Sequence, residues 1–401
     1  MILNMTASAL VDIDNTPSIA SNDLRVRLEA LPERARLGEE WESLEKQSAS
    51  SFFQSWLWIG CWLECLPASV SVLLLRITAG ERTVGLAIVG QRNITRHRVL
   101  HSRAWFLNET GVPAYDALTI EHNGILADRS VAPQVDIAVA RFFQDRRQGW
   151  DEIYISGVVE QDAFALTPQA PITPKLIDAK PYFFVDLSEL RAAKQSYLER
   201  LSSNTRSQVR QTLRSYERIG PLRLQLAADT AEAFRYLERL KELHTSYWID
   251  KGRPGAFATP LQHDFHRRVV ELGVAQGRIQ LLKITAGEQE VGYLYNLVCG
   301  DTVCSYQSGF VYDETDAKRR PGLVSHYLAV EHNLAAALRI YDFLAGDARY
   351  KRSLSTHDGM MKWLAWQKPR LKFRIEKFAG EQKQRVLAWL AQRRSRAPKP
   401  G

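Results

Sequence analysis

The sequence predicts an α+β protein in which one topology occurs twice, and three observations lead to this prediction. The chain has 401 residues, 45% of them hydrophobic and 24% charged, so it is long enough for two or three domains with apolar cores. A twelve-residue segment recurs, because LLRITAGERTVG (74–85) and LLKITAGEQEVG (281–292) agree at nine positions. A helical stretch and then a strand follow each copy in the same order.

The first half begins with a strand and a helix. Residues 25–31 alternate between polar and apolar side chains, and Pro32 then opens a helical stretch. Residues 57–75 are strongly hydrophobic, but Glu64 and Pro67 interrupt them, so we expect a short aromatic helix and a strand rather than a membrane span. The other elements expected here are a hairpin (69–77 and 84–91), a helix (134–147) and a buried strand (150–157).

Prolines separate the two halves. Four of them lie between Pro168 and Pro181, which predicts a linker. The expected organisation is a loose leader (1–22), a first domain (23–180), a second domain (181–380) and a basic tail (381–401). The second domain is expected to contain strands at 182–187, 279–285, 291–299, 302–309 and 340–346, and helices at 190–218 with a break near Ser203, 230–250, 261–277 and 321–338. This order fits a sheet that begins antiparallel and ends with a parallel crossover.

Charge and cysteine content restrict the class of protein. The 53 basic and 45 acidic residues leave a net charge of +8, which favours anionic partners such as phosphorylated cofactors, nucleic acid or a membrane surface. The four cysteines form two close pairs, Cys61 with Cys65 and Cys299 with Cys304, without the further ligands that a zinc site needs. No basic stretch precedes an apolar one near the N-terminus, so we expect a cytoplasmic protein with reduced thiols and no metal.

The segment SYQSGFVYDETDAKRRPGLVSHYLAVEH (305–332) contains the clearest chemical signal. A strand ends near Gly309, a polar loop follows, and RRPG (319–322) opens a helix. A helix start offers unpaired N–H groups and the positive end of the helix dipole, and Gly322 lets the backbone approach a phosphate. The segment therefore predicts an anion site, with a plain strand–loop–helix carrying a solvated basic loop as the alternative.

Arginine recurs at every fourth residue of one expected helix, at Arg206, Arg210, Arg214 and Arg218. This spacing keeps the four side chains on one face, where like charges repel unless an anion binds them. The row predicts a binding surface for a phosphate-rich donor, a carrier protein or an acidic polymer. A solvated face, partly compensated by Glu199 and Glu217, is the alternative. Aromatic residues are too few there for a base-stacking platform, so we do not expect nucleic acid on this helix.

These segments resemble a known superfamily. Arg319-x-x-Gly322, between a strand and a helix, looks like the pyrophosphate motif Q/R-x-x-G-x-G/A of the GNAT acyltransferases, although Val324 stands at its last small position. The order of segments resembles the CelD branch, duplicated GNAT-like proteins associated with bacterial cellulose and exopolysaccharide synthesis and related to the FemAB-type peptidyltransferases. The resemblance rests on SFFQSWLWIGCWL (51–63), SSNTRSQVRQTLRSYERIG (202–220), YWIDKGRPGAFA (247–258), YQSGF (306–310), PGL (321–323) and DFLAGDARYK (342–351).

The resemblance implies two tandem GNAT-like domains, each with a mixed, mostly antiparallel sheet flanked by helices. It also implies acyl transfer from an acyl-CoA, such as acetyl-CoA, without a metal. The pantetheine arm would lie where strands 302–309 and 340–346 splay apart. The residues implied for donor binding are Gln307, Ser308, Gly309, Arg319, Arg320, Gly322 and Leu323.

Catalysis is implied at the end of the second of these strands. Asp347 would act as the base or orient the amine, Tyr350 would protonate the leaving thiolate, and Lys351 would hold a phosphate or an acidic substrate. A turn or N-cap at Asp347 and core packing of Tyr350 are the alternatives. Strand-end N–H groups would stabilise the oxyanion.

The acceptor is expected against Tyr247, Trp248 and Tyr306. Residues 244–257 would roof its pocket, or form a structural cap. His326 and His332 are expected to pack or lie on the surface. The first half has no arginine ahead of the glycine in its corresponding loop (107–118), so we expect that copy to be non-catalytic.

The sequence thus predicts an N-acyltransferase that modifies an amine or hydroxyl of a small molecule or of a cell-envelope or exopolysaccharide precursor. Polysaccharide-synthesis proteins are its expected protein partners. Two alternatives remain at this point: an aminoacyl-tRNA donor, as in the FemAB relatives, and a non-catalytic scaffold in polysaccharide synthesis. Apart from tRNA in the first alternative, no nucleic-acid partner is expected.

Overall fold

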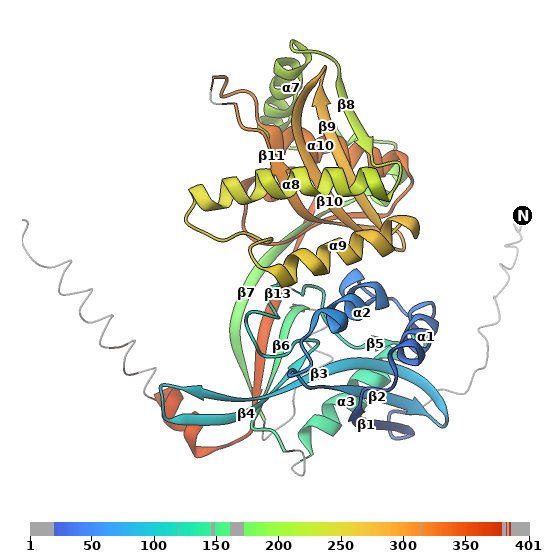
Figure 1. Cartoon of the computed structure of the whole chain (residues 1–401), viewed down its shortest axis with the longest axis vertical. Coiled ribbons are helices and arrows are strands. Elements are labelled where there is room, and N and C mark those ends of the chain that lie inside the picture. Colours follow the sequence, from blue (N-terminus) through green and yellow to red (C-terminus); the bar gives the residue numbers. More distant parts are fainter. Residues whose placement is uncertain are drawn as a thin grey trace, which may run out of the picture.

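The strands of both halves join into one mixed sheet of thirteen strands (Figure 1). This computed structural model describes residues 20–378, apart from 119, 146–148, 161–171 and 314, together with residues 382 and 385. Most of the expected leader and tail therefore lie outside the described residues. Along the sheet the strands follow the order β1 (Leu24–Ala30), β2 (Val72–Ala79), β3 (Arg82–Arg96), β4 (Leu100–Leu107), β6 (Glu152–Val159), β13 (His357–Gln367), β7 (Thr173–Asp186), β12 (Ile340–Ala345), β11 (Thr302–Phe310), β10 (Gln289–Cys299), β9 (Ile279–Ala286) and β8 (Leu222–Leu226), with β5 (Leu126–Ala127) beside β3.

Helices flank this sheet in both halves (Figure 1). The helices of the first half are α1 (Arg34–Glu45), α2 (Trp56–Cys65) and α3 (Ala132–Gln144), with a short 3₁₀ turn at Phe52–Gln54. The helices that follow β7 are α5 (Leu187–Ala192), α6 (Tyr197–Arg200), α7 (Ser203–Glu217), α8 (Thr230–Asp250), α9 (Pro260–Ala275), α10 (Pro321–Ala335) and α11 (Arg349–Leu354).

The two halves share one topology. In each half, two helices separate the first two strands, as α1 and α2 do after β1 and α8 and α9 do after β8. Two further antiparallel strands follow, and a helix then leads to a strand that lies parallel to its neighbour, β6 beside β4 and β12 beside β11. The repeated segments form the hairpins β2–β3 and β9–β10. The predicted mixed fold with flanking helices is confirmed.

The halves exchange their last strands. β7 follows β6 in the chain but pairs with β12, while β13 follows β12 but pairs with β6. β7 and β13 also pair with each other along eleven positions, so they join the two halves into one sheet. The linker prediction is therefore wrong from Thr173 onward, where the proline-rich segment is part of β7. The division at residue 180 falls inside this strand.

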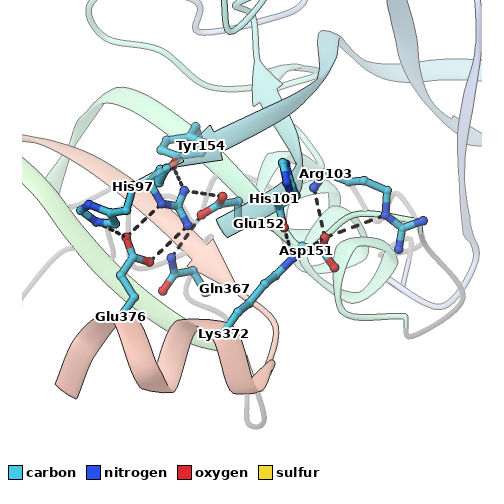
Figure 2. A network of polar contacts seen from close by, with 10 residues as sticks. His97, His101, Arg103, Asp151, Glu152, Tyr154, Gln367, Lys372 and Glu376 are labelled. Carbon is cyan, nitrogen blue, oxygen red and sulfur yellow. Dashed lines mark hydrogen bonds and ion pairs between the residues drawn. The ribbon is translucent and has the colours of Figure 1, made fainter. Parts of the chain in front are cut away.

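A short helix that follows β13 forms ion pairs with the first half. Residues 371–378 are helical, and from this helix Glu376 binds Arg96 at 2.9 Å while Lys372 binds Asp151 at 2.9 Å (Figure 2). Arg96 also donates at 2.6 Å to Glu152, whose side chain is completely buried. Because an unpaired buried charge is costly, these contacts anchor the helix at 371–378 to the end of β3 and the start of β6.

An aromatic core joins the halves at α2 and α9. Trp58 of α2 packs edge to face against Phe265 of α9, with ring centroids 4.8 Å apart, and against Tyr306 of β11 at 5.6 Å. Gly273 gives α2 room to approach, because a Cβ there would stand 2.9 Å from Leu57 Cδ2. Separating the halves would expose these rings, so the first half has a fixed position against the second.

The predicted helix and strand at 57–75 are confirmed as α2 and the start of β2. Over the ranges that the structure covers, no helix combines the length and the apolar character that crossing a bilayer requires. All four cysteines are free thiols. Within the same ranges, no group of three metal-ligating side chains comes together.

Candidate active site

The parallel strands β11 and β12 separate after a short paired stretch. They pair only from Thr302 opposite Ile340 to Cys304 opposite Asp342, although β11 continues to Phe310 and β12 to Ala345. Beyond Cys304 the facing edges of the two strands therefore have no ladder partner in each other. Backbone N–H and C=O groups left in this way need another partner, and an extended ligand can supply it.

A cavity of about 1020 Å³ lies at this gap. Its walls come from β11, the start of α10, the end of β12, α11, one side of α8 and Glu121 of the first half. All the residues that the sequence analysis proposed for the site line it: Tyr247, Trp248, Tyr306, Gln307, Ser308, Gly309, Arg319, Arg320, Gly322, Leu323, Asp347, Tyr350 and Lys351. The structure thus brings these side chains together, and their individual roles stay predictions.

The start of α10 forms one end of the cavity. Pro321 occupies the first turn, and no side chain caps the N-terminus by a hydrogen bond. Gly322 lets the ring of Phe310 pack against the helix start, because a Cβ there would lie 3.1 Å from that ring. Val324, the departure from the pyrophosphate motif, is fully buried in the core and does not line the cavity. The larger residue at that position therefore does not narrow the expected anion site.

The two arginines before α10 already have partners. Arg319 forms ion pairs with Asp313 and Asp316, and Arg320 donates to the side chain of Gln208. The pKa of Asp313 is lowered to about 2, first by hydrogen bonds from Thr315 and then by Arg319. These contacts order the loop in front of the helix and leave its net charge close to zero.

β11 contains one extra residue at the cavity. Tyr295 of β10 pairs with Gln307 and Asn296 pairs with Ser305, so Tyr306 has no counterpart and forms a bulge. A bulge leaves the backbone of its extra residue without a ladder partner, and this one lies near the middle of β11. The hydroxyl of Tyr306 donates to the carbonyl of Leu118 at 2.9 Å, and burial raises its pKa.

The end of β12 is strained and held by side chains. Leu344 has a φ of 63°, a conformation that branched side chains rarely adopt. The carboxylate of Asp342 accepts the N–H of Leu344 at 2.6 Å. Lys351 donates to the carbonyl of Ala345 at 2.7 Å and to that of Leu344 at 3.2 Å, and burial lowers its pKa. Lys351 therefore supports the shape of the strand end.

Glu121 is a functional candidate that the sequence analysis missed. It belongs to the first half, yet its carboxylate accepts the N–H of Ala345 at 2.7 Å and lines the cavity. Burial raises its pKa, against the opposing effect of Lys351. Next to it, His122 Nε2 lies 2.8 Å from Asp342 Oδ2. The only local signal was the polar run Glu-His-Asn within a loop that is otherwise short of charge.

The ring of Tyr350 packs against a histidine of α10. It stacks on His326 with centroids 4.7 Å apart and meets the edge of Phe343 at 6.2 Å. Burial raises the pKa of Tyr350, so its phenol stays protonated at neutral pH. Burial lowers the pKa of His326 to about 3, so this ring is neutral and serves packing.

Asp347 lies at the exposed mouth of the cavity. Its side chain is 62% exposed and forms an ion pair with Arg352. The position suits contact with an incoming acceptor better than proton transfer deep in the gap.

The roof over the cavity is held by His244 of α8. Its Nδ1 donates to the carbonyl of Ser308 at 3.0 Å, and its Nε2 accepts the N–H of Ala256 at 3.1 Å. Burial lowers the pKa of His244, in keeping with this neutral form. Tyr247 of the same helix stacks on Tyr312 with centroids 5.3 Å apart. The expected cap at 244–257 is thus fastened to β11.

The matching gap in the first half is filled by protein. β4 and β6 also pair at only three positions, from Ala104 to Phe106. Here, however, the N–H of Asn123 donates to Gly157 of β6 at 3.0 Å, and Ser156 donates to Glu109 at 2.7 Å. The segment between β4 and β5 thus occupies the edge where an arm would lie. Its far end carries Glu121 into the other site.

Comparisons with known proteins identify a domain type and structures with a similar fold. Residues 203–352 match the model of an acetyltransferase (GNAT) domain. Among solved structures, FemX matches with 10% identity and a TM-score of 0.54, over 84% of this chain and 96% of that one. L-PGS from Bacillus licheniformis matches with 9% identity and a TM-score of 0.51, over 85% and 94%. None of the curated proteins compared with the chain matches it. At these low identities, the two matches show that this chain has a similar fold to FemX and L-PGS.

Proposed function

We propose that this chain, an acyltransferase by virtue of its GNAT domain, transfers the acyl group of an acyl-CoA, such as acetyl-CoA, to an amine or hydroxyl. The observation that carries the proposal is the gap between β11 and β12, which opens into a cavity bounded by an uncapped helix start. The acceptor we propose is a small molecule or a precursor of the cell envelope or an exopolysaccharide. Its chemical identity rests on the resemblance to the CelD branch.

Donor binding follows from the shape of the gap. The amide groups of the pantetheine arm would pair with the free edge of β11 beyond Cys304, as an added strand does. The diphosphate would then reach the start of α10, where the N–H groups of Gly322 and Leu323 and the helix dipole favour an anion. Arg319 and Arg320 flank this position.

The cavity also offers groups for each step of acyl transfer. The acceptor nitrogen attacks the thioester carbonyl carbon, a C–N bond forms, and the C–S bond breaks. The negative oxygen that develops would face the free N–H at the Tyr306 bulge. Glu121 would take the proton that the amine loses, and Tyr350 would give a proton to the departing thiolate. Asp347, at the mouth, would orient the amine.

One observation favours a second class of donor, aminoacyl-tRNA. The arginine row on α7 adds positive charge beside the cavity, and aminoacyl-tRNA is a polyanion that carries an activated acyl group. Such binding weakens steeply as salt rises, because each phosphate contact releases counterions. Competition by tRNA against acetyl-CoA, repeated at two salt concentrations, separates the two donors.

The experiment that tests the proposal is a transfer assay with the purified full chain. Acetyl-CoA and longer acyl-CoAs are offered together with a panel of amino sugars and amino acids, while free thiol and product mass are followed. We expect thiol release that saturates with donor and depends on one class of acceptor. Absence of acetyl-CoA binding to the folded protein at millimolar concentration would contradict the proposal.

A further inference from the structure

The basic face of α7 is a charged surface of the second half that the proposed reaction leaves unused. Arg206, Arg210, Arg214 and Arg218 line it together with Lys318, around a surface hollow of about 610 Å³. The remaining lining residues are Ser203, Ser207, Gln211 and Ser215, so the hollow contains no acidic and no aromatic side chain. No ion pair joins any of these five side chains to a carboxylate in the described part of the chain, although Asp316, which accepts from Ser215, lies near Lys318.

This face is fastened to the loop that leads into the active site. Thr212 donates to the carbonyl of Lys318 at 3.0 Å, and Ser215 donates to the carboxylate of Asp316 at 2.6 Å. Gln208, on the same helix, accepts from Arg320 and itself lines the cavity. A body bound on the basic face therefore sits directly beside the start of α10.

The distribution of charge can accommodate a donor larger than free CoA. At the helix start Arg319 forms ion pairs with Asp313 and Asp316, and Arg320 donates to the uncharged side chain of Gln208, so little net positive charge is left there, which suits the single negative charge of a phosphodiester. The unbalanced positive charge lies outside, on α7, and spans more than three helical turns. One nucleotide cannot cover that length. The pattern matches an arm with one phosphate attached to a large acidic body.

Resting on the proposed function, we propose that the basic face of α7 docks the acidic surface of a carrier protein. The phosphopantetheine arm of that carrier would deliver the acyl thioester into the gap between β11 and β12. The chemistry is unchanged, since the C–N bond forms, the C–S bond breaks, and the carrier leaves with a free thiol. A protein surface fits better than nucleic acid because the face offers no ring on which a base could stack.

The test compares two donors and two charge reversals in the full chain. The donors are acetyl-CoA and an acidic acyl carrier protein bearing an acetylated phosphopantetheine. The docking variant is Arg210→Glu/Arg214→Glu, both exposed and without ion pairs to described carboxylates. The matched control is Arg25→Glu/Arg27→Glu on β1, exposed side chains at the opposite end of the molecule (Figure 1).

For wild type we expect kcat/KM to be higher with the carrier-bound donor than with acetyl-CoA. The docking variant is expected to lose roughly 10- to 100-fold in kcat/KM with the carrier donor, because charge complementarity acts mainly on association. Its activity with acetyl-CoA should stay within about twofold of wild type, since surface charges away from the reacting groups leave the chemical step unchanged. The control should match wild type with both donors.

Other outcomes overturn the inference in distinguishable ways. If acetyl-CoA is used but the carrier donor is not, or if the docking variant uses both as wild type does, the basic face does not dock a carrier. If tRNA displaces the carrier and the docking variant loses tRNA binding, the face belongs to nucleic acid. If neither donor supports transfer by wild type, the proposed function itself fails.

Discussion

Replacing Tyr350 by phenylalanine is expected to lower kcat by roughly 100-fold or more, which is the usual size of a lost general acid. The phenol is the proton donor that we assign to the leaving thiolate. The melting temperature should stay near that of wild type, because the ring still stacks on His326 and meets Phe343. Thiol release at saturating donor, together with calorimetry, measures both quantities.

A second tyrosine provides the matched control. Tyr327 lies on α10, where its ring stacks on Tyr197, and it does not line the cavity. Tyr327→Phe should leave kcat unchanged. Equal kcat values for the two variants would remove Tyr350 from the mechanism and leave it with core packing alone.

Replacing Glu121 by glutamine is expected to lower kcat by roughly 100-fold without loss of stability. The amide oxygen of glutamine can still accept the N–H of Ala345, so the contact between the halves is kept. The charge, and with it the capacity to accept a proton, is lost. Asp347→Asn is the comparison, because it removes the other candidate carboxylate at a well-solvated position. We expect that variant to change KM more than kcat.

The direction in which Glu121→Gln changes the stability of the fold depends on pH and can be predicted. Burial raises the pKa of Glu121 in the folded protein above its value in the unfolded chain. The folded state therefore binds the proton more tightly, and this group stabilises the fold at low pH but loses that contribution as the pH rises through the raised pKa. Above that pH, Glu121→Gln should melt at or above the temperature of wild type. A clear fall in melting temperature would show a mainly structural carboxylate.

The pH profile gives an independent check on the same residue. Only the ionised carboxylate can take a proton, so the wild-type rate should fall on the acid side as Glu121 becomes protonated. The midpoint of this fall should lie above the ordinary range for a glutamate, in the direction of its raised pKa. The acid limb should be absent from the residual rate of Glu121→Gln. An unchanged limb in the variant would assign it to another group.

Much of the second half could be predicted because its signals are local. The start of α9 has a proline in its first turn and a capping box between Thr259 and Gln262, and it was expected within one residue. The residues of β11, α10 and the segment after β12 that line the cavity could be grouped from the sequence because they lie in two short segments of the chain. Local patterns of this kind depend on neighbours in sequence.

The parts that sequence reasoning missed depend on partners far along the chain. Residues 173–180 are exposed, contain Pro174 and are followed by Pro181, and they become a strand only because β13 pairs beside them. β13 was missed for the same reason, since it completes the sheet of the other half. Glu121 reaches the cavity through a loop of the half expected to be inactive. No spacing rule within one half could place that carboxylate.

The central claim is that the gap between β11 and β12 holds the arm of a thioester donor. A crystal structure of the full chain grown with coenzyme A tests it most directly. We expect the arm along residues 305–310, with phosphate oxygens at the N–H groups of Gly322 and Leu323. Continuous pairing of the two strands up to Phe310, or an arm bound elsewhere, would contradict the account.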